Sequence, residues 1–393
     1  MMFGFISAVL VYALITFGGV LRHTWLALEA AWLIGFTILI ILKCLKGEPL
    51  RFSLIVAFAI SAVLSLRTEP NLGLGVLAAA WTYHACRDTS SKVQQFLHVL
   101  LFIGIVEAAL GTVQYLIAPG WIFGYINETQ NTSGTFINRN HFAGLLEMLI
   151  PVAFGLAYMS ARTFREFAKP YLYLLAGAYM ALALMLSLSR MGVFCFLCTF
   201  VFCGLLLQMR KRGRVIPVLG LSMLGLIFLG AVWVGIDALA ARYSQLLGPD
   251  ATIREDRLLI FRDTVRMISV NPLGIGSGGF QDRFRPYQTV RLDLVFDHAH
   301  NDYLETASEW GIPTAVAFWV FVVSAFVRAV RLFLTIRSTR RAGLLLACCG
   351  AIFAILIHSA ADFNLQIPSN SMLFFVFVGM SLAISPADAK TFA

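Results

Sequence analysis

Long apolar segments recur along the whole of this 393-residue chain, and they restrict its fold more than any other feature. Each holds about 20 residues, enough to cross about 30 Å of hydrocarbon as a helix. Charged residues make up 13% of the sequence, whereas soluble domains carry roughly 25%. The sequence therefore predicts an all-α polytopic membrane protein, with a single integral membrane domain over residues 1–393.

The apolar segments predict about twelve transmembrane helices. The first lacks the basic start and small-residue cleavage site of a signal peptide, so we expect it to be retained. The third and fourth are short, which leaves open that they are tilted or partly re-entrant. The expected ranges are 3–21, 25–43, 52–66, 71–86, 96–118, 141–160, 171–189, 191–209, 215–236, 308–330, 342–360 and 369–386.

Basic residues are distributed unequally between alternate connections, and this predicts the orientation. One side carries eighteen of the thirty basic residues, including all six lysines. By the positive-inside rule that side faces the cytoplasm, and both chain termini lie on it. This placement accounts for the net charge of +9, so no nucleic-acid partner is needed.

Two substantial loops are expected on the opposite, periplasmic side, at residues 119–140 and 237–300. The first is turn-rich and nearly uncharged. Within the second, residues 237–298 hold eight arginines, eight acids and no lysine. Guanidinium groups bind phosphate bidentately, which favours phosphate recognition. The alternative is that the arginines pair with the acids on a solvated surface.

An amphipathic helix is predicted inside the second loop, from Arg254 to Ser269. Its apolar residues recur three and four positions apart and face one way, whereas Arg262 and Arg266 share another face. The glycine-rich stretch 274–279 follows as a turn, since no strand precedes it to make a dinucleotide-binding unit. The expected apolar face consists of Leu258, Phe261, Val265 and Ile268.

Proton-handling side chains are concentrated between Asp297 and Glu305, directly before an apolar segment. His300 is the natural general base there, because an unperturbed imidazole titrates near pH 6.5. For His298, two residues earlier, we favour a histidine satisfied by local hydrogen bonds, with orientation of the site as the alternative. A metal site formed by Asp297, His298, His300 and Asp302 is an alternative, but ligands so close in sequence seldom converge without help from elsewhere.

Three sequence elements resemble the O-antigen ligase family. The first is Ser189-Arg190-Met191-Gly192, at a helix junction. The second is the run RLLIFRDTVRMISVNPLGIGSGGF, which begins at Arg257. The third is His300-Asn301, nine residues and then Gly311-Ile312-Pro313-Thr314. Phe261, where the family often has tryptophan, and Pro313 depart from the pattern. The resemblance covers roughly residues 130–380.

The resemblance implies a GT-C-type glycosyltransferase in a bacterial inner membrane, inverting, independent of metal and without a cofactor. The implied donor is an undecaprenyl-diphosphate-linked glycan, and the implied acceptor is lipid A–core or a growing glycan; membrane lipids surround the protein. His300 would be the base, and Arg257 and Arg190 would hold the diphosphate. Weaker substrate-binding candidates are Asn301, Arg139, Arg262, Arg266 and His298.

Other polar residues lie in or beside apolar segments. Glu107 and Glu147 are expected within helices, where acids mark function by default. Asn140 and Glu147 are seven positions apart on one helix face, so they either line a cavity or bond to each other. Asp362 and Asn364 resemble a late polar element of the family, without a role that the sequence explains. Cys195 and Cys198 are expected to pack among apolar side chains.

Three classes of function fit the hydropathy pattern. A transferase uses the histidine and arginine set at one membrane face. A secondary transporter or lipid-linked glycan flippase also has about twelve helices, but such proteins often contain repeated halves, and the sequence shows no repeat. A non-catalytic scaffold has no use for the histidines and arginines. Within the transferase class, the His-Asn motif favours an O-antigen ligase over a polymerase.

Overall fold

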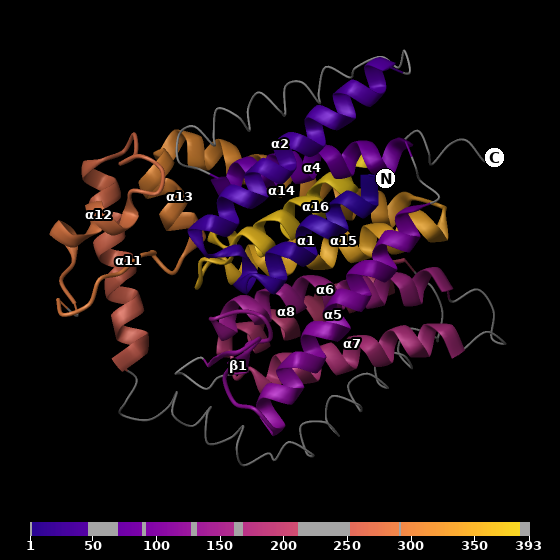
Figure 1. Ribbon diagram of the computed structural model, residues 1–393, viewed down its shortest axis with the longest axis horizontal. Helices are drawn as coiled ribbons and strands as arrows, with labels where there is room; N and C mark the ends of the chain where they lie inside the picture. Colours follow the sequence, from indigo (N-terminus) through magenta and orange to yellow (C-terminus); the bar gives the residue numbers. More distant parts are fainter. Residues whose placement is uncertain are drawn as a thin grey trace.

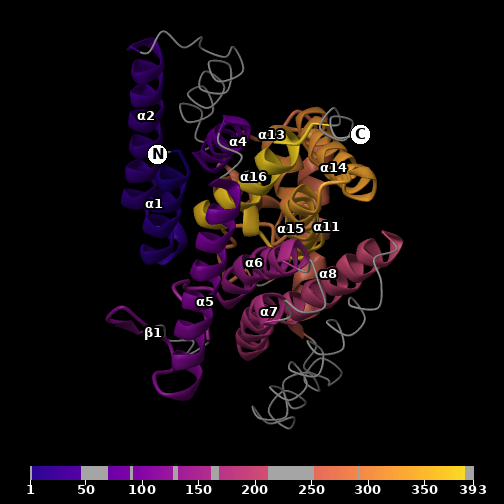
Figure 2. The same ribbon diagram turned by 90° about the vertical axis from the view of Figure 1, so that its right-hand side faces the viewer.

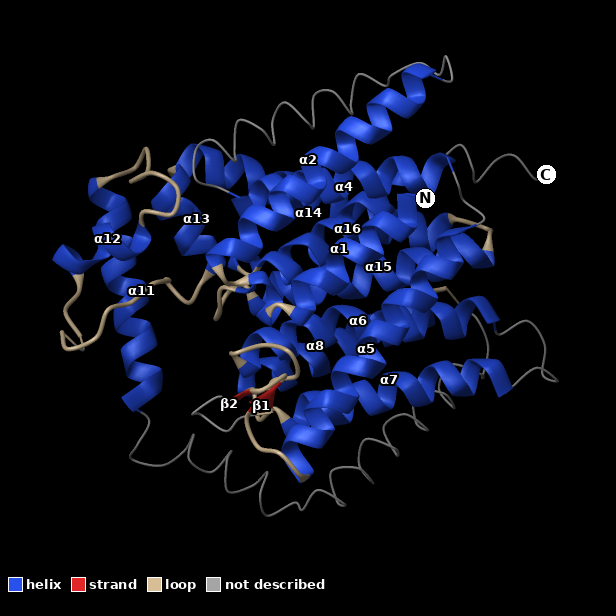
Figure 3. Cartoon of the chain, viewed as in Figure 1, coloured by secondary structure: helices blue, strands red, loops and turns tan. Residues whose placement is uncertain are grey.

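The computed structural model describes residues 2–45, 70–88, 92–126, 132–160, 168–210, 252–290 and 292–385. Helices dominate these ranges, and Figure 3 shows one short hairpin of strands at the side of the bundle. The helices are α1 Met2–Ile15, α2 Arg22–Leu45, α4 Pro70–Asp88, α5 Val93–Leu116, α6 Arg139–Ser160, α7 Ala168–Leu186, α8 Arg190–Met209, α11 Thr252–Val270, α12 Phe280–Phe284, α13 Asp302–Trp310, α14 Ile312–Thr335, α15 Thr339–His358 and α16 Pro368–Ala383. Single 3-10 turns are η1 Phe17–Gly19, η3 Arg285–Tyr287 and η4 Asn364–Gln366.

Six of the described helices are long and apolar enough to cross a membrane: α5, α6, α7, α8, α14 and α15. Three shorter apolar stretches accompany them, at Met2–Ile15, His23–Leu39 and Pro368–Ala383. The chain is therefore an all-α membrane protein. The helices expected at 52–66 and 215–236 lie outside the described residues, so the number twelve stays a prediction.

Helix α6 forms the centre of the bundle. Every residue from His141 to Met159 is buried, and α6 packs against α5, α7, α8 and α15. Its contact with α15 is close because glycines face each other: a Cβ on Gly155 would lie 2.4 Å from the carbonyl oxygen of Gly343. Small residues of this kind let membrane helices approach closely. This close contact fixes how α6 and α15 are positioned along each other.

Two expected helix boundaries are wrong, and left-handed backbone explains both. The helix expected at 3–21 ends at Ile15, because Phe17, Gly18 and Gly19 all have positive φ. The helix expected at 308–330 is in fact divided into α13 and α14. Gly311, with φ +82°, separates them. The backbone amide of the next residue, Ile312, donates a hydrogen bond to the carbonyl of Pro272 at 2.9 Å. Pro313 fits this arrangement, since proline suits the first turn of a helix.

Helices α11, α12 and α13 form a small unit at one end of the bundle (Figure 1). The amphipathic helix predicted at 254–269 is confirmed as α11, but the face that packs is only partly the expected one. Of the expected residues Ile268 is buried, whereas Leu258 and Val265 are more than half exposed. Ile260 and Met267 are buried against Phe280 and its neighbours. The glycine-rich turn fastens this unit to α13, through hydrogen bonds from the amides of residues 275 and 276 to the carbonyls of residues 308 and 309.

Candidate functional site

Polar side chains converge where the ends of several helices meet. Helix α6 begins there with Arg139 and Asn140, and α8 begins there at Arg190. Helix α15 ends there at His358, and α13 begins there after Asn301. The connection between α15 and α16 passes through this point and carries Asp362, a carboxylate with no exposed surface. Asp362 is the centre of the candidate site.

Four side chains from three different segments face Asp362: Asn140 and His141 lie on α6, Arg257 lies on α11, and His300 lies just before α13. Asn140 donates from Nδ2 to Oδ2 at 2.6 Å. Arg257 Nη2 lies 3.8 Å from Oδ2, His141 Nε2 lies 3.8 Å from Oδ1, and His300 Nδ1 lies 4.0 Å from Oδ1. Segments more than 200 residues apart in the chain thus meet at one carboxylate.

The electrostatics of Asp362 favour its charged form. Burial alone would raise the pKa of Asp362, but the facing His141 and the guanidinium of Arg257 outweigh burial and lower it. Arg257 is always protonated, so it is the cation that acts at neutral pH. Asp362 is consequently an ionised acceptor that holds Arg257 and faces two imidazoles.

Arg257 is held by two different acceptors. Its Nη1 donates to the carbonyl of Ala361 at 2.8 Å, while Nη2 faces Asp362. The side chain is 32% exposed. Because a guanidinium has five N–H donors, donors remain for a ligand that approaches from the open side. The geometry suits recognition of an anion.

His300 has an unusual backbone conformation. Its φ is +51°, in the left-handed region that non-glycine residues seldom adopt. Burial lowers the pKa of His300, Asp362 only partly offsets this, and Arg257 acts in the same direction as burial. Nδ1 makes no hydrogen bond to any described residue. The imidazole is therefore neutral at neutral pH and able to accept a proton.

His298 has a different environment from His300. Its Nδ1 lies 2.6 Å from Oε1 of Glu305, and its ring stacks on Phe363 with centroids 4.1 Å apart. Burial would lower the pKa of His298, but the Glu305 carboxylate raises it to about 9. His298 is thus a cation fixed by a local carboxylate. Phe363 also contacts the rings of His141 and His300, with centroids 4.7 and 5.0 Å away.

Asn301 and Asp302 fasten the His300 segment to the Asp362 segment. Asn301 caps α13 by accepting from the amide of Leu304, and its Nδ2 donates to the carbonyl of Ala360 at 2.9 Å. Asp302 is fully buried and accepts from Ser359 Oγ at 2.8 Å. Burial raises the pKa of Asp302 well above its usual value. Both residues thus hold the turn that carries His300.

Arg190 and Arg139 join the site through their neighbours. Ser189 caps α8, and its hydroxyl donates to Oδ1 of Asn140 at 2.8 Å. Asn140 in turn donates to Asp362. Arg190 follows Ser189 in the sequence, and Arg139 precedes Asn140, so each arginine is next to a residue of this hydrogen-bonded series. Arg262 and Arg266 lie apart from it: Arg262 bonds to Asp263 and Thr289, and Arg266 is exposed on α11.

The intramembrane acids have partners of their own. Glu107 accepts from the amide and hydroxyl of Thr135 at 3.0 and 2.8 Å. Glu147 lies 3.1 Å from Nδ1 of His358 through both oxygens. The proposed bond between Asn140 and Glu147 is therefore wrong, since Asn140 turns to Asp362 instead.

Among the described residues, three side chains of kinds that bind metal ions lie close together at one place. Ligand atoms of Glu147, Cys195 and His358 lie within 4.8 Å of one another, all buried. Of the ligands considered from the sequence, His298 is engaged by Glu305 and Asp302 by Ser359. His298 and Asp302 are thus engaged by other partners among the described residues.

Sequence reasoning left Asp362 without a role and did not consider His141. Asp362 follows an apolar helix and precedes a turn, so it resembles an ordinary loop acid until the fold places Arg257 and His300 beside it. The sequence did contain one signal: the predicted topology places the start of α6 and the end of α15 at the same membrane face, so residues 140–141 and 362 could have been expected close together. His141 lies next to Asn140 at that face and belongs to the same cluster.

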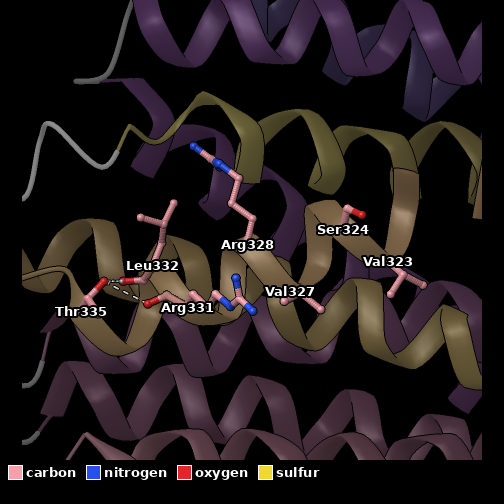
Figure 4. Close-up of a pocket in the computed structure, with 7 residues that line it drawn as sticks. All are labelled: Val323, Ser324, Val327, Arg328, Arg331, Leu332 and Thr335. Atoms are coloured by element: carbon pink, nitrogen blue, oxygen red, sulfur yellow. Dashed lines mark hydrogen bonds between the residues drawn. The ribbon is translucent and has the colours of Figure 1, made fainter. Parts of the chain in front are cut away.

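A hollow of about 520 Å³ lies elsewhere, along the half of α14 that is farther from α13 (Figure 4). It begins at Val323, eleven residues into the helix, or roughly 16 Å along its axis. None of its lining residues belongs to the Asp362 cluster. The lining residues are Val323, Ser324, Val327, Arg328, Arg331, Leu332 and Thr335.

The fold and the site define an all-α membrane protein with a cluster of histidines, an arginine and a carboxylate where its helices end. Residues 175–319 match the model of the O-antigen ligase family, and this match confirms the resemblance that the three sequence elements indicated. No curated protein matches the chain. The family is one of membrane glycan enzymes of the O-antigen ligase and polymerase type. Arg190, Arg257 and His300 fall within the matched range, whereas Asn140, His141 and Asp362 fall outside it.

Proposed function

We propose that the protein is a metal-independent, inverting GT-C-type glycosyltransferase of the inner membrane. It moves a glycan from an undecaprenyl-diphosphate carrier to an acceptor hydroxyl at the periplasmic face, in the manner of an O-antigen ligase. The observation that carries this proposal is the convergence of Arg257, His300 and Asp362. The family match supports the reaction class, since it spans the first two of these residues.

The reaction has two requirements, and the site offers a residue for each. A hydroxyl oxygen of the acceptor forms a bond to the anomeric carbon of the donor, and its proton passes to the neutral imidazole of His300. At the same time the bond between the anomeric carbon and the diphosphate oxygen breaks, and its electron pair leaves with the diphosphate. Arg257 and Arg190 stabilise the negative charge that grows on this leaving group.

Asp362 organises the two halves of this chemistry. It holds the guanidinium of Arg257 on one carboxylate oxygen and faces His300 on the other. The 4.0 Å gap to His300 exceeds a hydrogen bond, but such contacts often tighten only when substrate is bound. Asp362 then stabilises the imidazolium that forms when His300 takes the proton.

Transfer by purified protein in lipid vesicles tests the proposal. The donor is a lipid-diphosphate-linked glycan, and the measured products are glycosylated acceptor and released lipid diphosphate. His300→Ala should lower the rate by about 10²–10⁴, and Asp362→Asn should also cause a large loss. His298→Ala should cost much less. Equal rates for wild type and His300→Ala would remove His300 from the proposed chemistry.

A further inference from the structure

A short hairpin between α5 and α6 exposes a group of aromatic side chains. Strand β1, Trp121–Ile122, pairs antiparallel with β2, Tyr125–Ile126, in a register that sets Trp121 opposite Ile126. Trp121 is 39% exposed, Phe123 51% and Tyr125 47%. The segment 117–126 contains no charged residue. The first outer loop, expected to be polar, thus carries an apolar, aromatic projection.

The hairpin is a built structure and is firmly attached at its base. Gln114, buried on α5, donates to the carbonyls of Trp121 at 2.8 Å and Gly134 at 2.6 Å, and accepts from the amide of Gly134 at 2.8 Å. Ile122 is buried beneath the hairpin. On the outer side, the ring of Tyr125 packs edge-on against Phe17, with centroids 5.8 Å apart. The aromatic rings are therefore presented in a fixed arrangement.

The tip of the hairpin has a residue that its backbone does not favour. Phe123 and Gly124 form the two-residue loop, with φ of +44° and +90°. Turns with positive φ at both positions prefer Asn-Gly or Asp-Gly, and a bulky residue in that region is a true outlier. The turn therefore presents a half-exposed aromatic ring at a position where its backbone would favour asparagine.

The surroundings of the hairpin identify what covers it. Figure 2 shows it projecting sideways from α5, away from the other helices. The chain places it at the membrane face where α5 ends and α6 begins. Helix α5 exposes Phe102, Val113 and Leu116, as expected where a membrane-spanning helix faces lipid, and the uncharged hairpin follows the end of this helix. Tryptophan and tyrosine are enriched at the boundary between hydrocarbon and water.

We propose that this aromatic hairpin, residues 121–126, inserts into the head-group region of the bilayer and anchors the connection between α5 and α6. The partner is the lipid surface itself. Twelve residues beyond Ile126, the same connection reaches Asn138 and then the site residues Asn140 and His141. The anchor therefore fixes the height of the α6 end relative to the lipid head groups. This inference stands apart from the reaction that the site performs.

Fluorescence quenching in vesicles tests the proposal. The full-length protein is reconstituted in lipids that carry bromine either near the head group or near the end of the acyl chains. The protein contains other tryptophans, so the emission of the Trp121→Phe variant is subtracted from that of the wild type. The difference is the emission of Trp121. We expect quenching of the Trp121 share by the shallow bromines, and weaker quenching by the deep ones.

Phe123→Asn and Phe123→Leu form a matched pair of variants. Asparagine suits the turn but removes the apolar ring, so it should keep or raise the melting temperature in detergent and reduce the quenching of Trp121. Leucine keeps the apolar character and the unfavourable turn, so quenching should be retained. This opposite ordering of stability and quenching is not expected of a residue with only a structural role.

Three results would overturn the proposal. Emission of Trp121 that no brominated lipid changes would place the hairpin in water. Emission that responds to an added soluble oligosaccharide, and not to brominated lipid, would make it a glycan-binding surface. Quenching that disappears as the protein-to-lipid ratio rises would place it between copies of the chain.

Discussion

At the scale of single residues, the two histidines of the His300 segment differ in charge, and this predicts a pH profile. Burial and Arg257 lower the pKa of His300 below its usual 6.5. A base with a depressed pKa stays deprotonated until the pH falls through that lower value. The ratio kcat/KM should therefore be level through pH 6.5 and fall only below it.

The pH profile also has an internal check. Asp362 raises the pKa of His300, so Asp362→Asn should move the acid limb of its residual activity to still lower pH. His298, with a pKa of about 9, is protonated throughout this range and cannot be the group observed. An acid limb above pH 6.5 in the wild type would contradict the assignment of His300 as the base.

Arginine geometry gives a second prediction for a single residue. Arg257 uses one nitrogen for the carbonyl of Ala361 and another for Asp362. Lysine keeps the charge but is a point donor without a planar fork. Arg257→Lys should thus lower the transfer rate by about 10²–10³, and Arg190→Lys should also be impaired. Arg337→Lys, exposed at the other end of α14, is the matched control and should be tolerated. Full activity of the Arg257→Lys protein would show that charge alone suffices.

At the scale of elements, the break between α13 and α14 is what joins the outer unit to the membrane bundle. A Cβ on Gly311 would lie 2.5 Å from backbone atoms of Leu273, at a φ of +82° that other residues disfavour. Gly311→Ala should destabilise the protein by about 1–3 kcal/mol and displace the glycine-rich turn from α13. We expect a lower melting temperature and lower activity. Gly204→Ala, where nothing lies within 4 Å, should change neither.

The elements also show how far the sequence can be read. Apolar segments predicted most helices, since about 20 apolar residues suffice to define a span. The break at Gly311 was missed, because a glycine inside an apolar run looks like a tolerated helix residue until Leu273 packs on it. The face of α11 was predicted only in part, because Leu258 and Val265 satisfy the helical period equally well. Ile268 is buried as expected, and only tertiary packing shows that Ile260 and Met267 are buried beside it in place of Leu258 and Val265.

The candidate site divides in the same way. His300, Arg257 and Arg190 were predicted because they lie in short local motifs, and their roles stay predictions. Asp362 was not assigned a role, since its place in the cluster depends on contacts with residues more than 50 positions away in sequence. Asn301 was predicted to bind substrate, and its observed hydrogen bonds cap α13 and bind the carbonyl of Ala360. Local patterns identify chemistry, whereas long-range pairing identifies what positions it.

At the scale of the whole molecule, the orientation in the membrane is the next test. Gln281 lies in α12, before the membrane-spanning helix α14, and Arg337 lies directly after α14. The excess of basic residues predicts that a reporter fused at Arg337 is cytoplasmic and one fused at Gln281 is periplasmic. A cytoplasmic Gln281 would put the Asp362 cluster on the wrong side for a periplasmic acceptor, and the proposed reaction would be withdrawn.

The last prediction chooses between a ligase and a polymerase. Both reactions use the same donor and leaving group, and His300, Arg257 and Asp362 serve either one. The acceptor differs: a ligase admits a final carrier such as lipid A–core, whereas a polymerase admits a second lipid-linked repeat. The His-Asn motif favours the ligase, so a deletion strain should leave long polymer on its lipid carrier and the final acceptor bare. Surface glycans separated on a gel report this directly. Acceptors that carry a single repeat unit in the deletion strain would instead identify the protein as a polymerase.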